Sequence, residues 1–70
     1  MSGFKRSLTI AGHSTSLSLE PEFWEALVKE AERRGQSVSS LAGEIDATRG
    51  GRNLSSAIRV WLFQKAAQQN

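Results

Sequence analysis

The chain has 70 residues and a formal net charge of +2 at pH 7, with no cysteine and one histidine. A chain this short buries a modest fraction of its surface, and without disulfide or metal ligands oligomerisation is the remaining source of extra stability. No apolar run approaches the roughly 20 residues that cross a bilayer, and none near the N-terminus is typical of a signal peptide, so we expect a cytoplasmic protein.

The first clear element is a strand at residues 14–19. In the sequence STSLSL, Leu17 and Leu19 alternate with Ser16 and Ser18, which is the period-two pattern of a strand that is buried on one face. The pattern predicts a short strand with leucines on one side and hydroxyls on the other.

A second β-prone segment precedes this strand. Its apolar residues Leu8 and Ile10 fall on even positions, whereas those of the strand fall on odd ones. Gly12 tolerates the backbone angles of a turn or bulge, so we place a break there. We therefore divide the chain into residues 1–13, either a flexible arm or an extra strand, and residues 14–70, the main domain.

The next segment predicts a helix that ends at Gly35. Pro21 suits the first helical turn, and glycine is a common helix stop. The apolar side chains at helical spacing form one stripe: Phe23, Leu27 and Ala31, flanked by Trp24 and Val28.

Two more helices follow. Ser37 is a suitable N-cap for a helix that runs to about Thr48, and Asn53 caps another from Leu54 to about Gln68. The apolar positions of the last helix are wider than one stripe, which predicts contact on two sides, as at a dimer interface: Leu54, Ala57, Ile58, Val60, Trp61, Leu62 and Phe63.

The run from TSLSLEPEFWEAL through ERRGQSVSSL resembles the ribbon-helix-helix family, the MetJ, Arc and CopG class of β-ribbon DNA readers. The stretch NLSSAIRVWLF, with the opening RSLTIAGHSTSLSLEPEFW, further resembles a bacterial subfamily of such domains. The resemblance implies a mainly α fold with a short β-ribbon, forming an intertwined ribbon-helix-helix dimer with an additional C-terminal helix.

A strand with one apolar face needs partners for its backbone and its leucines. Antiparallel pairing with a second copy would meet both needs and leave the serines facing outward. By resemblance, the residues that read DNA bases are Ser14, Ser16 and Ser18. The commonest specific contact to guanine uses a long arginine or lysine side chain, whereas these positions carry short serines. In this respect the sequence departs from proteins that read bases strongly. The residues that we assign to the dimer core are Leu17, Leu19, Phe23, Leu27, Leu41, Ile45, Ile58, Trp61 and Leu62.

Phosphate contacts are expected at helix starts and basic residues. The N-terminus of the second helix favours an anion, and the family places a DNA phosphate there. The predicted phosphate contacts are Lys5, Arg6, Ser37, Val38, Ser39, Arg49 and Arg52; for the arginines near the paired glycines, simple solvation is the alternative.

No set of residues predicts catalysis, a metal site or a cofactor. His13 has no second ligand beside it, and Trp24 and Trp61 fall on apolar helix faces, which favours packing over base stacking. We therefore expect a transcriptional regulator, a repressor that binds double-stranded DNA as a homodimer or a higher assembly. The alternative is a dimeric interaction module or antitoxin-like protein whose C-terminal helix binds a protein partner.

Overall fold

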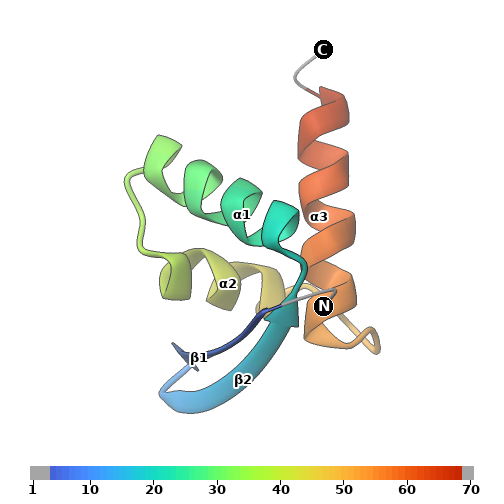
Figure 1. The fold of residues 1–70 in the computed structure, drawn as a ribbon. Coiled ribbons are helices and arrows are strands. Elements are labelled where there is room, and N and C mark those ends of the chain that lie inside the picture. The colour runs from blue at the N-terminus through green and yellow to red at the C-terminus, as the bar shows by residue number, and fades with distance from the viewer. Residues whose placement is uncertain (1–3, 69–70) are drawn as a thin grey trace.

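The computed structural model describes residues 4–68. Two strands, β1 (Phe4–Ile10) and β2 (His13–Leu19), precede three helices, α1 (Pro21–Arg33), α2 (Val38–Ala47) and α3 (Leu54–Gln68). The strands form an antiparallel ribbon. Helices α1 and α2 lie on one side of this ribbon, and α3 runs along the ends of both (Figure 1).

The segment before Gly12 is a strand and not an arm. It pairs with β2 in a register that runs from Phe4 opposite Leu19 to Ile10 opposite His13. Ala11 and Gly12 form the two-residue turn with φ values of 53° and 82°, both positive as in the type I′ turns that match strand twist. This turn places even-numbered residues of β1 opposite odd-numbered residues of β2, which accounts for the change of parity in the sequence.

Helix α1 begins and ends where the sequence predicts. Pro21 is its first residue, and Gly35 follows it with a φ of 68°. The N–H of Gln36 donates to the carbonyl of Ala31 at 2.9 Å, the bond that closes a Schellman motif. A glycine at this position avoids the steric cost of a left-handed conformation.

The predicted caps of the other two helices are confirmed. The Ser37 hydroxyl accepts a hydrogen bond from the N–H of Ser40 at 3.0 Å, and the side-chain oxygen of Asn53 accepts one from the N–H of Ser56 at 2.8 Å. Each bond satisfies a backbone donor that has no partner inside its helix. Sequence-local chemistry therefore sets the start of both α2 and α3.

One hydrophobic core lies between the inner face of the ribbon and the three helices. Its buried members are Ile10, Leu17, Leu19, Trp24, Leu27, Ala31, Leu41, Ala42, Ile45, Ala57, Ile58 and Leu62. The residues predicted for a dimer core all belong to it or pack against it, with Phe23 and Trp61 half-buried. The apolar residues that we expected to pack against a second copy thus pack against β1 and α3 of the same chain. Their role in a dimer stays a prediction.

The buried face of α1 is turned slightly from the predicted stripe. Trp24 is 3 % exposed and Leu27 and Ala31 are buried, whereas Phe23 and Val28 are half-buried at the flanks. Trp24 therefore packs in the core, as predicted, and offers no open ring face on which a base could stack.

Ion pairs at the C-terminal end of α1 position an arginine that contacts α3. The carboxylate of Glu30 binds Arg33 and Arg34, and hydrogen bonds from these two guanidinium groups lower the pKa of Glu30 to about 2. The guanidinium of Arg34 lies 4.9 Å from the ring centroid of Trp61 on α3. The Glu30 carboxylate thus positions a cation that packs on the neighbouring helix.

Helix α3 is apolar on more than one side. Ala57, Ile58 and Leu62 are buried in the core, while Phe63 on the outer side is 73 % exposed. Among the described residues, no helix has the length and apolar character needed to cross a membrane.

Candidate nucleic-acid interface

The outer face of the ribbon carries short hydroxyl side chains and one lysine. Because residues opposite each other in register share a face, the odd positions of β1 and the even positions of β2 point away from the helices. All of these side chains are exposed: Lys5, Ser7, Thr9, Ser14, Ser16 and Ser18. The structure thus places the three serines on the open side of the ribbon and adds three polar residues from β1 beside them.

This face suits a ligand rich in hydrogen-bond donors and acceptors. A hydroxyl both donates and accepts, and the lysine ammonium donates three hydrogen bonds. No carboxylate belongs to the outer face in the described part of the ribbon, so nothing on it repels a polyanion. A two-stranded ribbon also has the dimensions to enter the DNA major groove.

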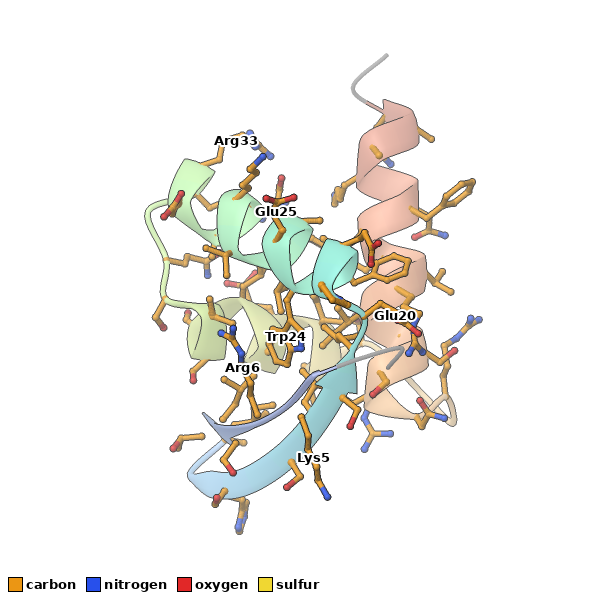
Figure 2. All side chains as sticks on the ribbon, in the orientation of Figure 1. Lys5, Arg6, Glu20, Trp24, Glu25 and Arg33 are labelled. Atoms are coloured by element: carbon orange, nitrogen blue, oxygen red, sulfur yellow. The ribbon has the colours of Figure 1, made fainter. Side chains whose placement is uncertain are left out.

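Lys5 and Arg6 point to opposite sides of the ribbon. Arg6 lies opposite Leu17 on the inner face, and its guanidinium is 4.9 Å from the ring centroid of Trp24. Figure 2 shows Arg6 directed toward Trp24 and Lys5 directed away from the helices. The predicted phosphate contact of Arg6 stays a prediction, and in this position its charge faces α1.

The N-terminus of α2 is the second feature of the candidate interface. Ser37 caps it through its side chain, and the backbone N–H groups of Val38 and Ser39 belong to the first turn, which has no intrahelical acceptors for them. Helix α2 packs on β1. Phosphate binding at its N-terminus stays a prediction.

Arg49 and Arg52 lie at the other end of α2. Arg49 forms an ion pair with Asp46 and donates to the backbone carbonyl of Arg52 at 2.7 Å. These contacts give Arg49 a structural role in the loop before α3. The residues predicted to contact phosphate therefore come from the ribbon and from both ends of α2.

Two long-range contacts that the sequence does not reveal hold the ribbon against α3. The Ser55 hydroxyl donates to the backbone carbonyl of Ser18 at 3.0 Å. Arg59 binds the carboxylate of Glu20 at 2.8 Å, and this hydrogen bond lowers the pKa of Glu20. The two contacts hold the end of β2 and the start of α1 against α3. The orientation of the ribbon relative to α3 is therefore fixed at this end.

A comparison with known proteins identifies this architecture. The family model described as a ribbon-helix-helix domain matches residues 4–66, and the chain therefore belongs to the ribbon-helix-helix domain family. β-Ribbon readers of DNA form one class of DNA-binding motif.

A solved structure shows the same fold. An uncharacterized protein from Bordetella pertussis Tohama I is similar to this chain, with 32% sequence identity and a TM-score of 0.80. The match covers 97% of this chain and 58% of the Bordetella chain, so this chain spans little more than half of that protein's length. Among curated proteins, none matches the chain.

Proposed function

We propose that this protein binds double-stranded DNA as a homodimer and regulates transcription in the cytoplasm, with the outer face of the ribbon in the major groove. The observation that carries the proposal is the exposed row of hydroxyl groups and Lys5 on an antiparallel ribbon. In this arrangement Ser14, Ser16 and Ser18 contact base edges, where a hydroxyl donates to or accepts from either base of a pair.

The helices supply the rest of the interface. Val38 and Ser39 at the start of α2 offer free N–H groups and the positive end of the helix dipole to a phosphate. Such contacts fix the orientation of the ribbon without reading sequence. A serine is short and accepts several base patterns, so the serines alone give limited sequence specificity. The shape of the DNA then contributes the remainder.

An interaction module is less well supported. Among the described residues, Phe63 is the one large apolar residue that is highly exposed. A single exposed apolar side chain is ordinary on a protein surface. The rest of the wide apolar set on α3 is buried or half-buried within the chain.

Selection of duplexes from a random pool by the purified protein tests the proposal. We expect enrichment of a two-fold symmetric site, with affinity that falls steeply with salt because phosphate contacts release counterions. The triple variant Ser14→Ala/Ser16→Ala/Ser18→Ala should stay folded and bind the selected site about tenfold more weakly. It loses three base contacts in each copy, each of them weaker than the bidentate pair that is worth about 1–3 kcal/mol.

Three measurements on the same samples separate the outcomes. Circular dichroism and sizing show whether the triple variant keeps its fold and its oligomeric state, and a titration with unrelated duplex measures non-specific binding. Absence of duplex binding by the unaltered protein at low salt would refute the proposed function. A triple variant that binds the selected site as tightly as the parent would refute the role of the serines.

A further inference from the structure

The two edges of the ribbon differ in their backbone groups. In a hairpin with a two-residue turn, the closing pair exchanges both hydrogen bonds, so His13 and the other odd residues of β2 bond to β1. The backbone groups of the even residues point to the far edge. Ser18 confirms this direction, because its carbonyl accepts from Ser55 on α3. In the described chain the sheet has two strands, which leaves Ser14 and Ser16 with an open edge.

The side chains at the two edges also differ. Every even residue of the β2 edge is a serine from Ser14 to Ser18, whereas the outer edge of β1 carries Lys5. Lysine is a residue that proteins place on edge strands to prevent further pairing. The β2 edge is therefore the one suited to a second copy, and pairing of even with even residues keeps the serines of both copies on one face.

In the homodimer proposed above, the two β2 strands then lie side by side. From this we infer that the two β1 strands flank them in a four-stranded sheet and lie along the groove rims, where Lys5, Ser7 and Thr9 bind phosphates. This inference rests on the proposed DNA binding and divides the outer face into two functions. The central β2 strands contact the bases, and the flanking β1 strands contact the sugar-phosphate backbone of the DNA.

The dimensions of the groove support this division. Strands lie about 4.8 Å apart, so the outer strands of a four-stranded sheet are separated by about 14 Å, three such spacings. The major groove is roughly 12 Å wide. The two central strands therefore fit between the sugar-phosphate chains, and the β1 strands meet these chains. If one hairpin entered the groove alone, Lys5 would instead lie over base edges.

Cross-linking tests the strand order, because the chain has no cysteine and each single-cysteine variant is unambiguous. Ser7 and Ser16 are opposite each other on one rung and both are exposed, so S7C and S16C are matched probes. With a bifunctional maleimide that spans less than the roughly 14 Å between outer strands, S16C should give covalent dimers and S7C should not. Dimers through S7C, or no dimers at either position, would overturn the inference.

DNA binding tests the division of functions. Lys5→Met should weaken binding to all duplexes by one common factor, and it should lower the slope of log K against log salt by about 2 per dimer, about 0.9 for each lost phosphate contact. Lys5→Arg should retain the parent slope. Ser16→Ala, the control, should leave the slope unchanged and alter discrimination between the selected site and its single-base variants.

The possible outcomes separate this inference from the proposed function. A Lys5→Met protein that loses discrimination at one base pair and keeps the parent slope would show that Lys5 reads a base, which overturns the rim assignment while DNA binding stands. A parent protein that binds no duplex refutes the proposed function and the rim assignment together. The cross-linking pattern then still shows which edge joins the copies.

Discussion

The two faces of the ribbon consist of alternating residues of the same strands, yet one face is buried in the core and the other is exposed. Leu17 is 2 % exposed and Leu19 is fully buried, while Ser16 and Ser18 beside them are exposed. A strand turns successive side chains to opposite sides, so the core residues alternate with the residues that we propose to contact DNA. Substitutions of adjacent residues should therefore have effects of different kinds, which three pairs of variants test in order of expected size.

The largest difference is expected between Leu19→Ala and Ser18→Ala. Removing a fully buried leucine side chain costs about 2–5 kcal/mol. Ser18→Ala should change the free energy of unfolding by less than about 0.5 kcal/mol, because the contact of Ser18 with α3 uses its backbone carbonyl. Urea unfolding followed by circular dichroism measures both. Equal midpoints for the two variants would contradict the assignment of faces.

A smaller difference is expected between Arg6→Met and Lys5→Met, which both keep an apolar stem. Arg6→Met removes a cation from the Trp24 ring and should cost roughly 0.5–2 kcal/mol of stability. Lys5→Met should leave the unfolding midpoint unchanged, since Lys5 points away from the helices (Figure 2). A reduced salt slope for DNA binding by Arg6→Met would instead show that Arg6 reaches a phosphate.

The smallest effect concerns the turn that keeps the two faces in register. Ala11 has a φ of 53°, a conformation that costs a residue with a Cβ about 1 kcal/mol. Ala11→Gly should therefore raise the free energy of unfolding by up to about 1 kcal/mol. The matched control is Gly12→Ala, for which an added Cβ meets no atom within 4 Å, so any loss of stability reflects the backbone angle alone. A destabilised Ala11→Gly protein would contradict this account of the turn.

Local patterns predicted most of the fold. The strand at residues 14–19 and all three helices lie where periodicity and capping residues place them, because these signals depend on residues a few positions apart. The ribbon partner was left open between an arm and a strand. Ala11-Gly12 is a weaker hairpin signal than Asn-Gly or Asp-Gly. In the structure β1 also packs on α2, a long-range contact that no local pattern shows.

The candidate site was predicted less completely. The outward position of the serines follows from alternation, but Arg6 was grouped with Lys5 by charge alone. Its even number matches Leu8 and Ile10, and this parity places it on the inner face once β1 is a strand. The bond from Ser55 to Ser18 joins residues 37 positions apart, a distance at which sequence spacing carries no information about contact.

The bond from Ser55 to Ser18 has a consequence for solubility. Open strand edges recruit further strands and seed fibres, particularly when they are long and flat. Here the first turn of α3 closes one end of the β2 edge, and a charged residue lies on the opposite margin of the ribbon. In the proposed dimer, these two features would limit strand pairing to one second copy and so oppose growth into fibres.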